Sequence, residues 1–431
     1  MAAWSAVAAG LFASAAASAA ELTYGVDVGV GHSDNITRVS ENEQDETIAT
    51  VGGQLGLDHD SRKLRANVAT RFEYLDYLDD TYDGELVGSL VGNATLDIVE
   101  ERFSWALTDT FGQVTQNQFA ASTPDNRENV NYLSTGPDLT LSLGSRNKLL
   151  LNGRYSDVHY ETSALGNQRV SAALAVRRDL SDATNVSVNV TTEQVSYDTA
   201  AETADYDNHE GFLNYSLDAA RTNLSIDAGA TEIETDDQKN SSWLGRISLT
   251  RRASPALTVG LELGHDFSDA GNSFVDQQAT QPGSVEPLPV QQTAMPFENA
   301  YVTAFGRFSR NRTGLQLRVG YYDESYDALP LFDRKRITLN LSVDRDLTSA
   351  LNAHVGANYS QQKYESLDLE FRDLIATFGV RWKLGRLVMM NIDYEYLKRS
   401  DDSGGSGYRA NEVWLRFGYL IGEGAAGGAG L

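Results

Sequence analysis

The chain of 431 residues carries 35 basic and 60 acidic side chains, which gives a formal net charge of -25. This excess of negative charge argues against nucleic acid as a partner, because phosphates bind to basic surfaces. The sequence contains no cysteine, which excludes disulfides, thiolate metal sites, cysteine nucleophiles and a lipid-modified N-terminal cysteine.

The first twenty residues differ from the rest of the chain. They are small and apolar, and Ala17-Ser18-Ala19 has the small-x-small form of a secretory cleavage site. We therefore predict a signal peptide at 1–20 that is cleaved near Ala19 or Ala20, although the stretch has no Lys or Arg. The alternative is a buried alanine-rich helix. After Ala20 no apolar run reaches the length of about 18 residues that a transmembrane helix needs.

The next segment opens an alternating pattern. In "LTYGVDVGVGHSDNITR", residues 22–38, the side chains of Val26, Val28 and Val30 fall on one face of an extended chain. The polar cluster that follows predicts the exit from this first strand into a loop. We expect Asp34 and Asn35 to cap and turn the chain there, rather than to bind a ligand.

A period of two continues along the chain to about residue 420. In 373–384, Leu374, Phe378 and Trp382 share one face, and Asp373 and Arg381 share the other. Only a strand separates them in this way, because successive side chains of a strand point to opposite faces. No stretch shows a convincing helical period. The sequence therefore predicts an all-β protein.

The predicted strands are long, and the connections between them alternate in length. Many strands run to about 12 residues, which rise about 30 Å at a tilt near 40° and so span the apolar band of an outer-membrane barrel. Nine short and ten long connections predict 20 strands, with 18 as the alternative. The short ones are 59–62, 99–101, 144–147, 180–184, 220–222, 253–255, 311–313, 348–350 and 385–386, and the long ones are 32–46, 78–85, 116–129, 161–167, 198–208, 235–241, 269–297, 328–334, 365–369 and 399–408.

The two faces of the strands indicate their surroundings. A closed barrel of about 20 strands is too wide for side chains to fill. The apolar face must then contact lipid, and the polar face must line a water-filled lumen. Solenoids and propellers also alternate, but their strands are shorter and a fixed sequence repeat is missing here. We predict one up-and-down antiparallel transmembrane barrel over 21–421, with short periplasmic turns, longer extracellular loops and a Gly/Ala-rich tail at 422–431.

Aromatic residues near the predicted strand ends support a membrane barrel. Interface belts of such barrels are rich in Trp and Tyr. The candidates are Trp105, Trp243, Trp382, Trp414, Phe72, Tyr74, Phe417 and Tyr419.

Charged residues on the polar faces are the candidate lumen site. Such charges can set an ion or solute preference, or they can form structural ion pairs across the lumen that keep a wide barrel round. The candidates are Arg65, Arg71, Glu73, Arg246, Arg252, Arg318, Arg336, Asp344, Asp373 and Arg381.

The longest connection, 269–297, holds four of the eight prolines. Long ordered loops are often functional, so this loop is a candidate constriction or lid folded into the mouth of the barrel. A disordered surface loop is the alternative.

Catalytic and metal motifs are weak. The sequence has no Gly-x-Ser-x-Gly elbow, and its six histidines lack zinc-ligand spacing. Residues 79–85, "DDTYDGE", resemble a calcium loop, but Leu90 stands where a bidentate acid should follow. We expect no catalytic, cofactor-binding or metal-binding residues, no cofactor and no enzyme activity.

The opening strand and its Ser33-Asp34-Asn35-Ile36-Thr37-Arg38 segment resemble a family. This is the family of β-barrel porins encoded with exopolysaccharide or capsule biosynthesis genes in Gram-negative bacteria, whose members open with a Gly-rich strand and a similar segment. The architectural resemblance covers the whole mature chain, and the motif covers about ten residues. One departure is that the last strand, "NEVWLRFGYLI", is followed by a Gly/Ala-rich tail rather than ending on an aromatic residue.

The resemblance implies a location in the outer membrane and a conduit for secreted polysaccharide. The polar lumen itself predicts a water-filled pore. The alternatives are a general porin for small hydrophilic solutes and a structural or adhesive barrel with a plugged lumen. The expected partners are outer-membrane lipid and lipopolysaccharide, the barrel-assembly machinery, periplasmic chaperones and polysaccharide export proteins, and we expect a monomer.

Overall fold

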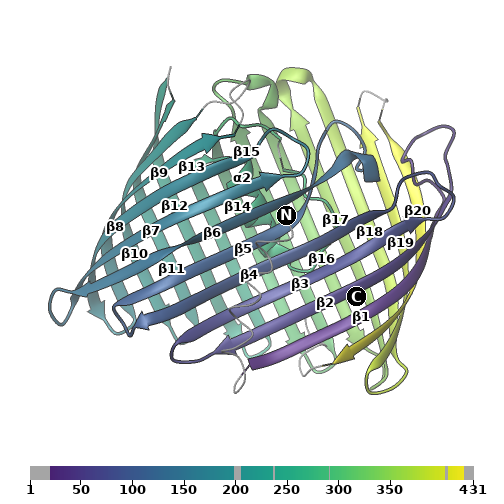
Figure 1. Cartoon of the computed structure of the whole chain (residues 1–431), viewed down its shortest axis with the longest axis horizontal. Coiled ribbons are helices and arrows are strands. Elements are labelled where there is room, and N and C mark those ends of the chain that lie inside the picture. Colours follow the sequence, from purple (N-terminus) through teal and green to yellow (C-terminus); the bar gives the residue numbers. More distant parts are fainter. Residues whose placement is uncertain (1–19, 199–204, 236–237, 291, 403–405, 422–431) are drawn as a thin grey trace.

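The chain forms a closed barrel of 20 antiparallel strands (Figure 1). The computed structural model describes residues 20–198, 205–235, 238–290, 292–402 and 406–421. Strand β1 (Ala20–Ser33) pairs with β2 (Glu46–Asp60) on one side and with β20 (Tyr408–Ile421) on the other, which closes the ring. The remaining strands are β3 (Leu64–Tyr77), β4 (Glu85–Val99), β5 (Phe103–Thr115), β6 (Arg127–Ser142), β7 (Asn147–Tyr160), β8 (Asn167–Ser181), β9 (Thr184–Tyr197), β10 (Tyr206–Ala219), β11 (Thr222–Thr235), β12 (Lys239–Ser254), β13 (Leu257–Ser268), β14 (Phe297–Arg310), β15 (Thr313–Ser325), β16 (Arg334–Asp346), β17 (Leu351–Tyr364), β18 (Leu369–Lys383), β19 (Val388–Asp401) and β20.

The observed topology confirms the predicted 20 strands. Each of the nine short connections falls at one end of the barrel, called here the turn end, and the ten longer ones fall at the opposite loop end. Even the segments with the weakest alternation, near 86–98 and 208–219, form full strands, β4 and β10. Among the described residues, no helix is long and apolar enough to cross a membrane.

The two faces of each strand differ as the alternation predicts. On β1, Val26, Val28 and Val30 are 63%, 54% and 43% exposed on the outer surface, whereas Asp27 between them is 2% exposed on the lumen side. The same contrast recurs around the ring, so an apolar outer wall encloses a polar interior.

The elements outside the strands are few and lie at the loop end. They are the helix α2 (Ala270–Thr280) and three single-turn 3₁₀ segments, η1 (Pro124–Asn126), η2 (Pro330–Phe332) and η3 (Glu365–Leu367). The expectation that no segment is helical is therefore wrong for α2. Its sequence, AGNSFVDQQAT, buries only one side with Phe274 and Gln278, which leaves little periodic signal.

The predicted aromatic belt is mostly on the outer wall, with one exception. Trp105, Trp243, Trp382, Tyr74, Phe417 and Tyr419 are all more than two-fifths exposed, and Phe72 is half-buried on the same outer face. Trp414 is wrong as a belt residue. It faces the lumen, is 7% exposed and packs with Ile36, Ile48 and Tyr77.

The lumen position of Trp414 explains the glycines of β1. Gly31 pairs with Trp414 across the closing seam, and a Cβ at Gly31 would lie 2.4 Å from the indole ring. A glycine is needed at this close approach because any side chain would collide with the ring.

The loop after β1 is tied to the last strand rather than shaped as a ligand site. Asn35 is completely buried, and its amide nitrogen donates to the carbonyl oxygens of Val39 at 2.7 Å and Arg409 at 2.8 Å. Asp34 accepts hydrogen bonds from the backbone and side-chain nitrogens of Asn411. The "SDNITR" segment therefore secures the seam at the loop end.

The described strands begin and end near the predicted limits of the barrel, 21–421, which stay a prediction. β1 begins at Ala20 and β20 ends at Ile421. The predicted signal peptide, except for Ala20, and the predicted tail at 422–431 lie outside the described residues.

Substitution at the seam should weaken the barrel. Gly31→Val should destabilise it by about 1–3 kcal/mol, since the new side chain must displace the Trp414 ring. The measurement is the temperature at which the folded band is lost in semi-native gel electrophoresis. Gly211→Val is the control, because a Cβ at Gly211 meets nothing within 4 Å. Equal melting of both variants would contradict the assigned packing.

Candidate functional site: a partly plugged lumen

The connection between β13 and β14 folds into the barrel. We call residues 269–296 the plug segment; it comprises α2 and an extended stretch, and position 291 is not described. Phe274 of α2 is completely buried, and it packs in a cluster with Val114, Val130 and Tyr160 of the barrel wall. Of the two expectations for this loop, the structure shows the inward constriction and not a surface loop.

A buried ion pair anchors the start of the plug segment. The guanidinium of Arg169 on β8 lies 2.8 Å from the carboxylate of Asp269, and the two side chains are 1% and 0% exposed. Asp269 also caps α2 by accepting a hydrogen bond from the backbone nitrogen of Asn272 at 2.8 Å, and it accepts one from the hydroxyl of Tyr206. Removal of one partner of such a pair costs about 3–5 kcal/mol, because a charge is left buried without compensation.

The plug segment reaches the opposite wall. Gln278 donates to the hydroxyl oxygen of Ser89 on β4 at 2.6 Å, and the backbone nitrogen of Gly283 donates to the same oxygen at 3.0 Å. Farther along, Leu288 forms a parallel bridge with Val114 of β5. The segment therefore spans the lumen from β13 to β4 and β5.

A second loop also folds inward, from the wall that the plug segment reaches. Residues 116–126 leave β5 and place Phe119 5.0 Å from the ring of Tyr364 on β17. The carbonyl oxygens of Ala120 and Ser122 accept hydrogen bonds from Arg399 of β19 and from Arg38. The two inward loops thus cross the loop half of the lumen from opposite sides.

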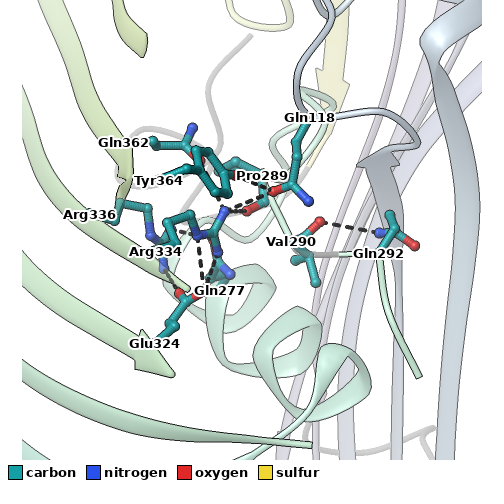
Figure 2. A network of polar contacts seen from close by, with 10 residues as sticks. All are labelled: Gln118, Gln277, Pro289, Val290, Gln292, Glu324, Arg334, Arg336, Gln362 and Tyr364. Atoms are coloured by element: carbon teal, nitrogen blue, oxygen red, sulfur yellow. Dashed lines mark hydrogen bonds and ion pairs between the residues drawn. The ribbon is translucent and has the colours of Figure 1, made fainter. Parts of the chain in front are cut away.

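Arg334 of β16 joins both inward loops to the wall (Figure 2). Its guanidinium donates to the side-chain oxygen of Gln118 at 3.0 Å, to the carbonyl oxygen of Pro289 at 3.2 Å and to Gln362 at 2.9 Å. Its charge is balanced by Glu324, whose carboxylate lies 2.6 Å away. Because this guanidinium is buried and fully partnered, it fixes the relative position of the two loops.

A neighbouring arginine binds the helix of the plug segment. Arg336 donates to the side-chain oxygen of Gln277 at 3.1 Å and lies 3.6 Å from Glu324 (Figure 2). Its guanidinium also stacks 4.4 Å above the ring of Tyr322. Guanidinium groups suit such sites because they stack and donate several hydrogen bonds at once.

The inward loops leave two cavities in the lumen. A cavity of about 530 Å³ lies between the plug segment and the loop half of the wall, and a second of about 930 Å³ extends to Pro255 and Asn311 at the turn end. Five residues line both cavities. These shared residues are Arg38, Gln281, Ser284, Glu286 and Pro287.

Aromatic rings and guanidinium groups line the lumen wall beside the first cavity. Tyr301 of β14 and Tyr322 of β15 lie with ring centroids 6.3 Å apart and an angle of 27° between their planes. One step toward the turn end, Arg318 lies 5.1 Å above the ring of Phe305. These residues face the lumen because they alternate with exposed outer-wall residues such as Val302.

Some buried polar atoms along the first cavity have no protein partner in the described part of the chain. They are Oδ1 of Asn299, Oγ of Ser360 and Nε of Arg336. Buried polar groups cost free energy unless they are hydrogen-bonded. Water or the hydroxyl groups of a solute would satisfy them.

The structure places all ten predicted lumen charges on the polar face, but it does not bring them into one site. Arg71 and Glu73 share a buried network with Asp27 of β1, and Arg246 pairs with Glu210 and Asp266. These pairs run along the wall between nearby strands, not across the lumen. Four of the other predicted charges lie near a wall group of opposite charge: Arg65 near Asp97, Arg318 near Glu262, Arg336 near Glu324 and Asp373 near Arg399. Asp344 and Arg381 line the larger cavity, and Arg252 is exposed near the turn end.

The residues that hold the two loops inside were not predicted. Arg169, Asp269, Gln118 and Arg334 join segments 100 or more residues apart in sequence, so no local pattern identifies their partners. One signal was present in part: Arg169 and Arg334 occupy polar-face positions beside the predicted long loops.

The described residues contain no group of three or more His, Asp or Glu side chains that could hold a metal ion. The calcium-like loop instead folds against β2, where the Glu46 carboxylate accepts hydrogen bonds from the backbone nitrogens of Asp79 and Thr81.

Part of the chain matches a known protein family. The family model described as "Putative beta-barrel porin 2" matches residues 336–417, which run from β16 to β20. No curated protein sequence shows significant similarity to the chain.

Among solved structures, the siderophore receptor PirA from Pseudomonas aeruginosa has 10% identity and a TM-score of 0.43, covering 93% of this chain and 80% of its own. A mutant of the ferric enterobactin receptor PfeA from Pseudomonas aeruginosa, in complex with enterobactin, has 9% identity and a TM-score of 0.46 over 94% and 82% of the two chains. A variant of the FrpB iron transporter from Neisseria meningitidis has 8% identity and a TM-score of 0.46 over 93% and 82%. Over residues 336–417 the chain is thus similar to a family of β-barrel porins.

Loss of the anchor of the plug segment should open the lumen. Arg169→Met leaves the Asp269 carboxylate buried without its cation, so the plug segment should detach and the ionic conductance of the barrel in planar bilayers should rise and fluctuate. Arg177→Met is the matched control, since Arg177 lies on the same face of β8 and pairs with Asp179 away from the plug segment. An unchanged conductance in Arg169→Met would show that the plug segment does not limit the pore.

The acid–base behaviour of the plug segment should appear as a pH-dependent selectivity. Enclosure by the barrel wall raises the pKa of Asp276 on α2 from 3.8 to about 6, and the carboxylate of Asp266 adds to the increase. Because the folded protein disfavours the ionised form, docking of the plug segment should weaken as the pH rises from 3.8 to about 6.

Ionisation of Asp276 also adds negative charge to the first cavity. Reversal potentials measured from about pH 5 to about pH 7 should therefore shift toward cation selectivity as pH rises. Asp276→Asn should remove this step, whereas Asp344→Asn, in the larger cavity, should retain it. A step that persists in Asp276→Asn would assign the titration to another group.

Proposed function

We propose that the protein is a monomeric β-barrel of the bacterial outer membrane and a water-filled pore for the export of an exopolysaccharide. The observations that carry this proposal are the two cavities beside the plug segment, one in the loop half of the lumen and one that reaches the turn end, which together would form a passage. A passage lined by polar groups lets a hydrated solute cross without contact with the apolar outer wall. The apolar outer face around the whole ring supports the proposal of a single chain surrounded by lipid.

The chemistry of the passage supports a saccharide as the solute. Sugar rings present apolar C–H faces and many hydroxyl groups. The Tyr301 and Tyr322 rings can contact such faces, and the unpartnered atoms of Asn299 and Ser360 can bond to hydroxyls. The resemblance of the opening segment to porins encoded with exopolysaccharide genes points in the same direction.

A barrel with a closed lumen is the second candidate. It is favoured by the two inward loops, which Arg334 holds together with a completely partnered guanidinium. In that case the function would lie in the loops, as in an adhesive or structural protein.

Conductance separates the two candidates. The refolded protein should conduct in planar bilayers, and uncharged sugars of increasing length should enter proteoliposomes that contain it. A closed trace, in the wild type and in Arg169→Met alike, would overturn the pore and leave the structural barrel.

Secretion separates an export role from general diffusion of small solutes. Deletion of the gene should reduce secreted polysaccharide, and the wild-type gene should restore it. Unchanged secretion, together with passage of small sugars in proteoliposomes, would favour a general porin.

A further inference from the structure

A band of basic residues lies on the outer wall at the loop end of five consecutive strands. Each of β16 to β20 contributes one member, and these strands lie side by side (Figure 1). We call this set the basic band; it consists of Lys335, Lys363, Arg372, Lys398 and Arg409.

The outward direction of the basic band follows from the alternation of each strand. Its members alternate with the buried lumen-side residues Arg334, Phe371, Leu397 and Tyr408. The strand register places Lys335 opposite Lys363 and Lys398 opposite Arg409, while on β18 Glu370 is opposite Lys363 and Arg372 lies two residues farther along.

The basic band lies just beyond a row of tyrosines on the same face. Each tyrosine lies closer to the barrel middle than a basic residue of the band. Tyr321 of β15 is opposite Ile337, two residues from Lys335, and Tyr359 of β17 is opposite Leu374, two residues from Arg372. Tyr396 of β19 is two residues from Lys398. Tyrosines of this kind mark the level where lipid tails give way to headgroups. The basic band therefore lies at the level of the headgroups of the outer leaflet.

Two members of the band form ion pairs, and three do not. Lys335 pairs with Glu365, and Arg372 pairs with Glu370 and Asp402. In contrast, Lys363, Lys398 and Arg409 make no ion pair with any residue that the structure describes. Unpaired cations at the level of the headgroups attract anionic lipid headgroups.

The rest of the loop-end outer wall differs in charge. On β10 to β12 the corresponding outward positions include Asp207, Glu232 and Glu234, and Lys239 there is paired with both glutamates at 2.7 and 3.4 Å. The positive potential of the band is thus a local feature in a chain of net charge -25.

We propose that the basic band binds the phosphorylated headgroup of a lipopolysaccharide molecule of the outer leaflet. The proposal rests on the outer-membrane location proposed above, but not on the pore. Five strands span four interstrand spacings, about 19 Å. That width exceeds a single phosphate and fits a diphosphorylated glycolipid headgroup, whose two phosphates would take the three free cations. The adjoining tyrosines would contact its sugars and the start of its acyl chains.

The test compares lipid binding by two triple variants of the full-length protein. In the first, Lys363→Gln, Lys398→Gln and Arg409→Gln remove the three free cations. In the second, Arg251→Gln, Arg310→Gln and Arg345→Gln remove three exposed basic residues on the outward face at the turn end. Each protein, in detergent, is titrated with diphosphorylated lipid A, dephosphorylated lipid A and phosphatidylglycerol, and retained lipid is quantified by native mass spectrometry.

We expect the first triple variant to lose affinity for diphosphorylated lipid A by at least about tenfold, since each basic residue near a membrane contributes to anionic lipid binding. The second triple variant should bind like the wild type. Dephosphorylated lipid A and phosphatidylglycerol should bind weakly to all three proteins. Equal losses in both triple variants, no loss in the first, or equal binding of phosphatidylglycerol by the wild type would each overturn the site.

Bilayer conductance keeps this proposal separate from the proposed function. The first triple variant should conduct like the wild type, because its substitutions lie on the outer wall. A wild type that binds the phosphorylated lipid but does not conduct would overturn the pore and retain the lipid site. The reverse outcome would overturn the lipid site alone.

Discussion

Closure of the ring by hydrogen bonds between β1 and β20 is the constraint on which the rest of the structure depends. A strand edge in lipid would leave backbone N–H and C=O groups without partners, at several kcal/mol each. The ten register pairs from Tyr24–Ile421 to Ser33–Glu412 remove that edge. At the seam the backbones must pass a lumen-facing indole, and Gly31 provides the necessary space. The loop after β1 adds Asn35 and Asp34 as further ties to β20.

Once the ring is closed with 20 strands, its interior is too wide for wall side chains to fill. The chain fills part of that space with two of its own loops, and it uses arginines of the wall to hold them. Arg169 binds Asp269 at the start of the plug segment, and Arg334 binds both loops at their crossing. Both arginines pair with buried carboxylates, Arg169 with Asp269 and Arg334 with Glu324, so their charges are balanced inside the barrel.

The sequence predicted the parts of the fold that depend on local alternation. A period of two can be recognised within a single segment of the chain. It predicts the two faces of each strand, the positions of the turns, and the inward direction of Arg71 and Asp373. Trp414 was assigned wrongly because its place near a strand end was weighed more heavily than its alternation with Val413 and Phe417, both exposed. The partners of the lumen charges could not be predicted, since Arg334 and Gln118 are brought together only by a lumen-crossing loop. The helix α2 was missed because its buried side includes glycine and glutamine, so its sequence lacks a clear apolar stripe.

The two inward loops fill only the loop half of the lumen, and the larger cavity extends to the turn end. Water and ions that enter this cavity from the turn end would give it a low electrical resistance. A potential across the membrane would therefore fall mainly over the thin layer formed by α2 and the crossing of the loops. A charge moved through the whole potential changes its energy by about 2.3 kcal/mol per 100 mV. The partial filling of the barrel would thus concentrate the electric field on the plug segment, whose contacts with Arg169, Ser89 and Arg336 hold it to the wall.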